Sequence, residues 1–137
     1  TVGDHPGESS DVQAIVSYFG ASNLTTILAQ STPHGLNVRE PALKLLLGTL
    51  PESAKELAEL ASPVFQVDRR DPPLLLLHGD QDPQMPINQA HELDGAYTQL
   101  GLDVSLDVVH GAAHGGDAFF SGDHLTRALE FLHRTIG

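Results

Sequence analysis

The stretch at residues 74–86, "LLLLHGDQDPQMP", decides the fold class. Four consecutive leucines are followed at once by a histidine, a glycine and two aspartates. A short run that is apolar at every position, with Pro73 in front and Gly79 behind, is typical of a strand covered on both faces in a parallel sheet. We therefore expect an interior strand that ends in a loop carrying Asp80 and Asp82.

Two further strands and two helices are predicted around this run. The strands are "VQAIVSYFG" at 12–20 and "LDVSLDVVHG" at 102–111, both short and rich in β-branched residues. Helices are predicted at 86–101 and 123–136, because apolar residues recur there every three or four positions. These residues are Ala90, Leu93, Tyr97 and Leu100 in the first helix, and Leu125, Leu129, Leu132 and Ile136 in the second. Strands alternating with helices predict an α/β protein with a parallel sheet of about three strands.

Residues 23–72 follow a different pattern. Short helical segments alternate with prolines, and we expect Pro33, Pro41 and Pro51 to break them. Two interpretations stay open for this region. It is either a cap-like helical insertion over a functional site or a plain crossover with an extra helix. In both cases the chain is one domain, with residues 73–137 forming a strand-helix-strand-helix unit.

Composition excludes several classes of function. The chain of 137 residues carries 18 acidic and 7 basic side chains, a formal charge of −11. This balance argues against nucleic acid and against an anionic membrane surface as partners. The absence of cysteine excludes disulfides, thiolate metal sites and a cysteine nucleophile. We find no signal-peptide pattern in residues 1–11 and no apolar run long enough for a transmembrane helix, and the compartment is not determined.

Polar residues that follow the strands are the candidates for chemistry. The second strand leads into Asp80 and Asp82, and the third leads into His110, His114 and Asp117. Ligands of open α/β sheets bind beyond the carboxyl ends of the strands, so these loops should share one crevice. An aspartate bonded to one imidazole nitrogen leaves the other nitrogen to act as a general base.

A metal site is the alternative for the second of these loops. His110 and His114 are four residues apart and Asp117 follows, a spacing that suits a metal ion when the residues lie on a helix. The glycines at 111, 115 and 116 argue against a helix in this stretch. We therefore expect no metal here.

The two loops resemble the C-terminal part of an α/β-hydrolase, closest to the esterase and prolyl-oligopeptidase-like branches. These families carry an H-G-x-x-D loop, matched by residues 78–82, and a G-x-x-H-G loop, matched by residues 111–115. The resemblance implies that Asp82 is the acid and His114 the base of a Ser-His-Asp triad. It also implies a serine hydrolase that acts on small-molecule carboxylic esters and requires no cofactor. Asp80, His110 and His78 are then expected to be structural residues of the two loops.

The nucleophile motif of that family, G-x-S-x-G, does not occur in the sequence. The nearest match, "GASNL" at 20–24, lacks the second glycine and lies too close to the acid. We therefore expect the serine to lie upstream, and this chain alone to be inactive. The strand edge at 14–19 should then self-associate or pair with the serine-bearing part. The alternative is a non-catalytic α/β module that binds a ligand or a partner chain.

Overall fold

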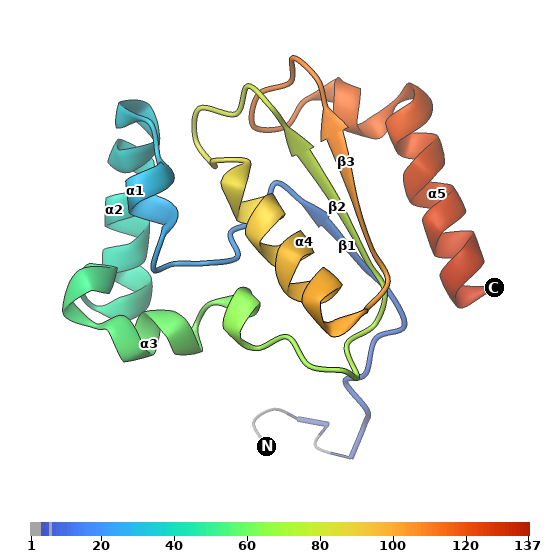
Figure 1. Ribbon diagram of the computed structural model, residues 1–137, viewed down its shortest axis with the longest axis horizontal. Coiled ribbons are helices and arrows are strands. Elements are labelled where there is room, and N and C mark those ends of the chain that lie inside the picture. The colour runs from blue at the N-terminus through green and yellow to red at the C-terminus, as the bar shows by residue number, and fades with distance from the viewer. Residues whose placement is uncertain (1–3, 6) are drawn as a thin grey trace.

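The fold is a three-stranded parallel sheet with helices on both faces. We analysed a computed structural model that describes residues 4, 5 and 7–137; the stretch 1–11, where no signal peptide is expected, lies partly outside them. The strands are β1 (Ile15–Tyr18), β2 (Leu74–Gly79) and β3 (Val104–Val109), in the order β1-β2-β3 (Figure 1). Both strand pairs are parallel, which confirms the predicted α/β architecture.

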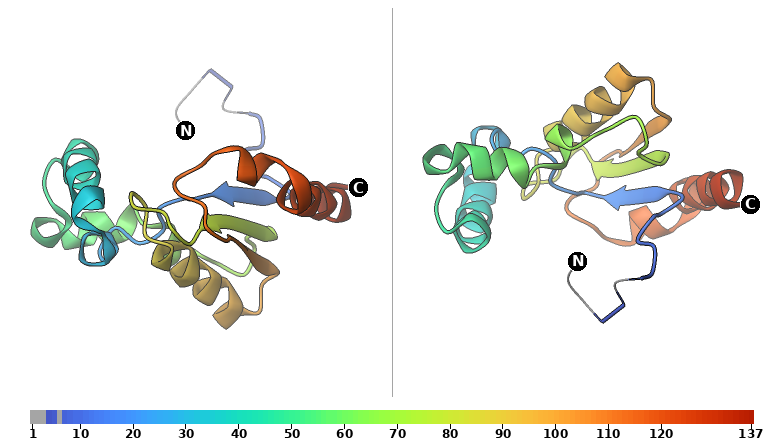
Figure 2. Two further views of the ribbon diagram at one scale, coloured as in Figure 1. Left: turned by 90° about the horizontal axis from the view of Figure 1, so that it is seen from above. Right: turned by 90° about the horizontal axis from the view of Figure 1, so that it is seen from below.

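The leucines of β2 form the centre of two hydrophobic cores. Leu75 and Leu77 face helix α5 (Gly122–Ile136), and Leu74 and Leu76 face helix α4 (Asn88–Leu100). All four are buried, because β2 has a strand on either side and a helix over each face. Figure 2 shows α4 and α5 at different sides of the three strands.

The two flanking helices pack in different ways. Helix α4 uses the predicted face: Ala90 and Tyr97 are buried against the sheet, and Gly101 ends the helix in a left-handed conformation. Helix α5 packs instead through Ala128 and Phe131. Of the predicted leucine face of α5, Leu132 packs against this core, and the rest lies along the flank of the helix. Its members Leu125, Leu129 and Ile136 are between 37% and 58% exposed.

Residues 23–72 form a small helical lobe beside the carboxyl end of the sheet (Figure 1). Its elements are α1 (Ile27–Gln30), α2 (Pro33–Leu47), η1 (Pro51–Ser53), α3 (Lys55–Leu60) and η2 (Pro63–Phe65). Outside the lobe, the 3-10 turn η3 (Asp117–Phe120) precedes α5. The predicted break at Pro41 is wrong, because α2 runs through it. A proline removes one backbone hydrogen bond, and burial of Leu43 and Leu47 on the same helix outweighs that loss.

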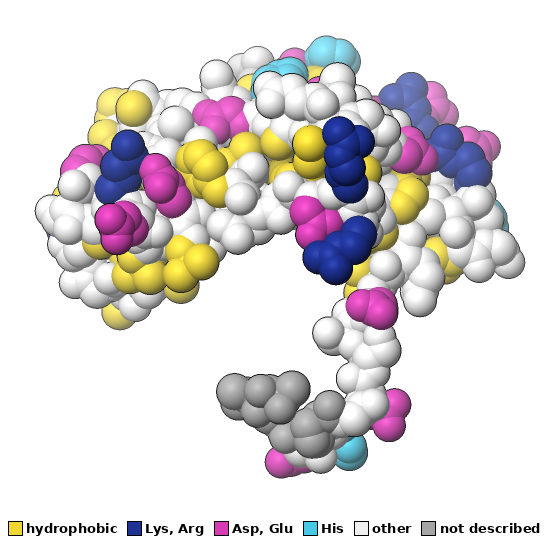
Figure 3. All heavy atoms as spheres, turned by 60° about the horizontal axis from the view of Figure 1, so that its bottom comes forward, with side chains coloured by type: hydrophobic (Ala, Val, Ile, Leu, Met, Phe, Trp, Pro, Cys, Tyr) yellow, Lys and Arg dark blue, Asp and Glu magenta, His cyan; other side chains and the backbone are white. Residues whose placement is uncertain are grey.

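The lobe has a core of its own. Leu24, Ile27, Leu43, Leu47 and Ala58 are buried together with one residue from outside the lobe, Met85. Exposed hydrophobic side chains also gather over its elements (Figure 3), among them Leu45 on α2 and Leu60 on α3. Across the residues that the structure describes, no helix combines the length and the apolar character needed to cross a membrane.

Candidate active site

The predicted acid and base are hydrogen-bonded at the carboxyl end of the sheet. Nδ1 of His114 donates to Oδ2 of Asp82 at 2.7 Å, which confirms the predicted proximity. The Asp82 side chain is 0% exposed and that of His114 is 25% exposed. With Nδ1 engaged in this bond, Nε2 is the ring nitrogen that is left to accept a proton. The catalytic roles of the two residues stay predictions.

The loop at residues 80–86, here called the acid loop, holds Asp82 in one orientation. The other carboxylate oxygen, Oδ1, accepts the backbone N–H groups of Gln84 and Met85, each at 2.8 Å. These bonds form because Asp82 begins a tight turn, and side chains of Asp commonly bond the backbone two or three residues on. The buried carboxylate therefore has three hydrogen-bond donors and little freedom to rotate.

His78 lies beneath the acid loop and supports it, as its expected structural role requires. Its Nε2–H donates to the carbonyl of Met85 at 2.9 Å, and the same nitrogen lies 3.5 Å from Oδ2 of Asp82. Its Nδ1 atom is buried and makes no hydrogen bond within the described part of the chain. Burial lowers the pKa of His78, against smaller raising effects of the Met85 carbonyl and Asp82. The lowered pKa of His78 favours its neutral form beside the buried Asp82 carboxylate.

The helical lobe contacts the acid loop at three points that the sequence did not reveal. The Thr32 hydroxyl donates to the carbonyl of Pro83 at 2.7 Å, and Nε–H of Arg39 donates to the carbonyl of Gln84 at 3.2 Å. The Met85 side chain fills the core of the lobe. Thr32 and Arg39 are about 45 to 51 residues from their partners in sequence, so no local pattern could link them. Partial burial lowers the pKa of Arg39, and the nearby Asp82 charge opposes that shift.

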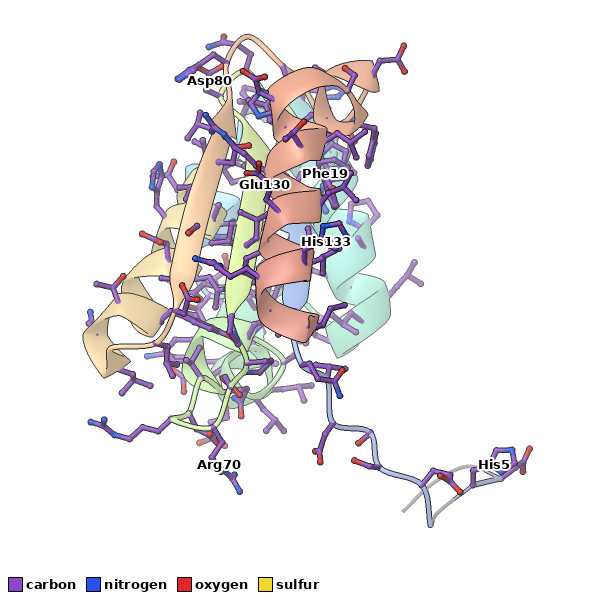
Figure 4. The ribbon with its side chains drawn as sticks, turned by 90° about the vertical axis from the view of Figure 1, so that its right-hand side faces the viewer. His5, Phe19, Arg70, Asp80, Glu130 and His133 are labelled. Atoms are coloured by element: carbon purple, nitrogen blue, oxygen red, sulfur yellow. The ribbon has the colours of Figure 1, made fainter. Side chains whose placement is uncertain are left out.

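The loop at residues 110–117, here called the base loop, joins the acid loop through Asp80 and Gly79. The Asp80 carboxylate accepts Nδ1–H of His110 at 2.8 Å and N–H of Gly111 at 2.7 Å. The His110 bond, and then the Gly111 bond, lower the pKa of Asp80. A Cβ atom on Gly79 would lie only 2.2 Å from the carbonyl oxygen of Ala112, so only glycine allows the two loops to approach this closely. Figure 4 shows Asp80 at the carboxyl end of the strands.

No metal centre is formed by these histidines. His110 and His114 direct their Nδ1 atoms to two different carboxylates, Asp80 and Asp82. Within residues 4, 5 and 7–137, no cluster of three or more His, Asp or Glu side chains is arranged to hold a metal ion.

A second Asp–His pair lies away from the two loops. His124 of α5 bonds Asp107 of β3 at 2.7 Å, and Arg127 pairs with the same buried carboxylate. The pair fixes α5 against β3.

Solved structures of similar fold define the class of protein. The truncated form of a carbohydrate esterase from gut microbiota matches with a TM-score of 0.85 and 25% sequence identity, over 98% of this chain and 46% of that one. The Pyrococcus horikoshii acylaminoacyl peptidase matches with a TM-score of 0.75 and 26% identity, over 93% of this chain and 20% of that one. Both are α/β-hydrolase fold proteins, and this chain has the same fold over the matched part.

A family model narrows the class further. The BD-FAE model, an esterase-type domain, matches residues 2–97, so the chain belongs to the BD-FAE family. A curated relative is the non-reducing polyketide synthase mapC of Penicillium brevicompactum, 32% identical over 96 residues, which are 64% of this chain and 4% of that protein. The chain thus spans less than half the length of each of these proteins.

Proposed function

We propose that this chain supplies the acid and the base of a Ser-His-Asp triad in a hydrolase of carboxylic esters. The observation that carries the proposal is the 2.7 Å bond between Nδ1 of His114 and the buried Asp82 carboxylate, at the sheet edge where α/β proteins bind ligands. Membership of an esterase-type family supports the same reaction class. No cofactor enters the reaction.

The geometry of the pair defines the role of each residue. Asp82 accepts Nδ1–H and thereby keeps Nε2 of His114 unprotonated. Nε2 takes the proton of a serine hydroxyl as its oxygen bonds the ester carbonyl carbon, and the proton then passes to the departing alcohol oxygen. The acyl group is then bound to the serine oxygen. In the second half of the cycle Nε2 takes a proton from water as the water oxygen bonds the acyl carbon, the bond from that carbon to the serine oxygen breaks, and the proton passes to the serine oxygen as the carboxylic acid leaves. The buried position of Asp82 stabilises the imidazolium that forms in each half.

We further propose that the serine is carried by a segment that adds beside β1. In the described sheet β1 pairs only with β2, so its outer edge offers unpaired N–H and C=O groups. Tyr18 and Phe120 lie next to that edge, with ring centroids 5.0 Å apart, and Phe120 is 54% exposed. Helix α5, which covers the face of the sheet where Tyr18 packs, adds exposed leucines to the apolar surface of the molecule.

The same edge should make the isolated chain self-associate, with two copies of β1 pairing antiparallel. Sedimentation of the purified chain over a concentration series measures this. Growth of the apparent mass with concentration is expected. A monomer at every concentration, with slow hydrogen exchange along 14–19, would contradict it.

The helical lobe at 23–72 is proposed to shape the pocket for the acyl or the alcohol part of the substrate. It adjoins the carboxyl end of the sheet and contacts the acid loop through Thr32, Arg39 and Met85. Functional side chains on such segments are commonly positioned by the rigid sheet beneath.

The test begins with the gene. A G-x-S-x-G sequence encoded in frame upstream of Thr1 supports the triad, and a start codon immediately before the codon of Thr1 supports a non-catalytic binding module instead. If the motif is present, the encoded protein should hydrolyse a p-nitrophenyl ester and be labelled on that serine by a fluorophosphonate. The isolated chain, treated in the same way, should show neither turnover nor labelling. Saturable turnover by the isolated chain would contradict the assignment of the serine to another segment.

A further inference from the structure

The backbone of Phe19 has a conformation that non-glycine residues rarely adopt. Its φ is +42°, and among the described residues it is the single non-glycine position with a positive φ. A bulky residue in this region is a genuine outlier, and such strain persists only where the surroundings hold it. Phe19 directly follows β1, and its N–H completes the ladder by donating to the carbonyl of Leu77 at 2.8 Å.

This conformation moves the ring to the other face of the sheet. Side chains alternate along a strand, so residue 19 should share a face with Ile15 and Ser17. Ile15 packs in the core beneath α4, whereas Phe19 packs with Val16 in the core beneath α5. The left-handed turn thus places the aromatic ring where an extended backbone would not, beside the upper part of α5 (Figure 4).

The ring lies against the imidazole of His114. The two ring centroids are 4.6 Å apart with planes inclined by 55°. Phe119 supports Phe19 from behind in an edge-to-face contact at 5.2 Å. A Cβ atom at Gly115 would be 3.7 Å from the Phe19 ring, so the base loop also follows its surface. Asp82 therefore fixes one edge of the imidazole, and the Phe19 ring packs against the imidazole in a tilted arrangement.

We propose that Phe19 is a positioning residue for His114: its strained backbone lays the ring on the imidazole, which keeps Nδ1–H directed at Asp82 and shields that bond from water. This rests on the proposed function of His114 as the base. Without the ring, the glycine-rich base loop has little else to prevent the imidazole from turning away from Asp82.

The experiment follows the Nδ1–H proton of His114 by NMR in the ¹⁵N-labelled chain, which needs no serine and no substrate. Phe19→Leu and Phe19→Gly both remove the ring, and the glycine variant also relieves the strained φ. We expect this proton to exchange with water about tenfold faster in both, since local opening governs such exchange. Phe19→Tyr, which keeps the ring, should restore the slow exchange.

Two controls separate positioning from general loss of structure. The Nδ1–H of His124, bonded to Asp107, should be unchanged in every variant, because Asp107 is on β3 and β2 separates β3 from β1, which Phe19 follows. Phe120→Leu removes a neighbouring ring that is not in contact with His114 and should leave the His114 proton unchanged. If Phe19→Leu fails to fold, Phe19→Gly decides the question alone, because glycine adopts this backbone freely.

The outcomes distinguish this proposal from the proposed function. Unchanged exchange of the His114 proton in Phe19→Gly, together with its loss in Asp82→Asn, overturns the positioning role and leaves the acid–base pair standing. A His114 proton that is unaffected by Asp82→Asn overturns both. Faster exchange at His114 and His124 alike also overturns the positioning role, since it reports general loosening of the fold.

Discussion

The acid loop and the base loop meet at one site but are held in different ways. The acid loop is fixed from every side: by two backbone N–H groups on Asp82, by His78 beneath, and by the helical lobe above. The base loop is rich in glycine and more exposed, and it is held by two hydrogen bonds from Asp80, one each from Gln81 and Asp82, and the Phe19 ring. An immobile carboxylate is thus paired with an imidazole on a more adaptable segment. In the proposed reaction Nε2 of His114 exchanges a proton with two different oxygen atoms, and both must lie within hydrogen-bond reach of the imidazole.

The largest expected effect concerns the acid of the pair. In a polypeptide that joins this chain to a serine-bearing segment, Asp82→Asn should lower turnover about 10⁴-fold, as the same change does in serine proteases. The amide donates where the carboxylate accepts, so the wrong tautomer of His114 is favoured. The matched control is Asp80→Asn, which should lose far less turnover because Asp80 contacts His110 rather than His114. Steady-state kinetics decide, and equal losses from both changes would leave the acid unassigned.

The next effect concerns the anchor of the acid loop. Met85→Ala should lower the free energy of unfolding by about 2–5 kcal/mol, because it leaves a cavity in the core of the lobe. Leu45→Ala, at a side chain that is 89% exposed, is the control and should change it by less than about 0.5 kcal/mol. Urea denaturation measures both. A negligible loss in Met85→Ala would mean that the lobe does not hold the acid loop.

The sequence predicted the sheet from local patterns, and it predicted the pairing of Asp82 with His114 from the resemblance of the two loops to those of α/β-hydrolases. Four consecutive leucines are buried on both faces when they form a central strand of a parallel sheet. The loops that follow parallel strands all lie at the same edge of that sheet. Periodicity also located α4 and α5. It identified the packed face of α5 only in part, because the apolar arc of that helix is wider than the surface the sheet covers, and the sheet covers the side of the arc that holds Phe131, Ala128 and Leu132.

The contacts that immobilise the site could not be predicted in this way. Thr32, Arg39 and Met85 act between segments distant in sequence, and none has a distinctive local signature. Helix α2 was predicted to break at Pro41 because local propensity was weighed without the tertiary packing that overrides it. The placement of the Phe19 ring on the opposite face of the sheet could not be predicted either, because the alternation of side chains along a strand assumes an extended backbone, and Phe19 has a positive φ.

A smaller, pH-dependent effect should appear beneath the acid loop. Burial holds the pKa of His78 below its ordinary value of 6.5. Between that value and the lower pKa of the folded state, His78 binds a proton in the unfolded chain but not in the folded chain. The stability contributed by neutral His78 is fully present above pH 6.5 and is lost as pH falls from there toward the folded pKa, by at most about 1.4 kcal/mol per pH unit. His78→Gln keeps an N–H donor for the Met85 carbonyl and cannot titrate. Urea denaturation at several pH values should give a flatter dependence for this variant, and equal slopes would contradict a neutral His78.

The smallest effect is expected where the two loops are joined at the surface. The hydrogen bonds from His110 and Gly111 lower the pKa of Asp80 below its ordinary value of 3.8. Ionised Asp80 therefore stabilises the fold above that value, and the contribution is lost as pH falls through the lower, folded pKa. Asp80→Asn keeps an oxygen for the Gly111 N–H but loses the charge that attracts His110. Its midpoint of thermal unfolding should lie slightly below that of the unchanged chain at neutral pH, and the two should converge in acid. Because Asp80 is open to solvent, salt should reduce the difference further. If the difference between the two unfolding midpoints grew in acid, ionised Asp80 would not be the group that stabilises this junction, and His110 would govern how the base loop is joined to the acid loop.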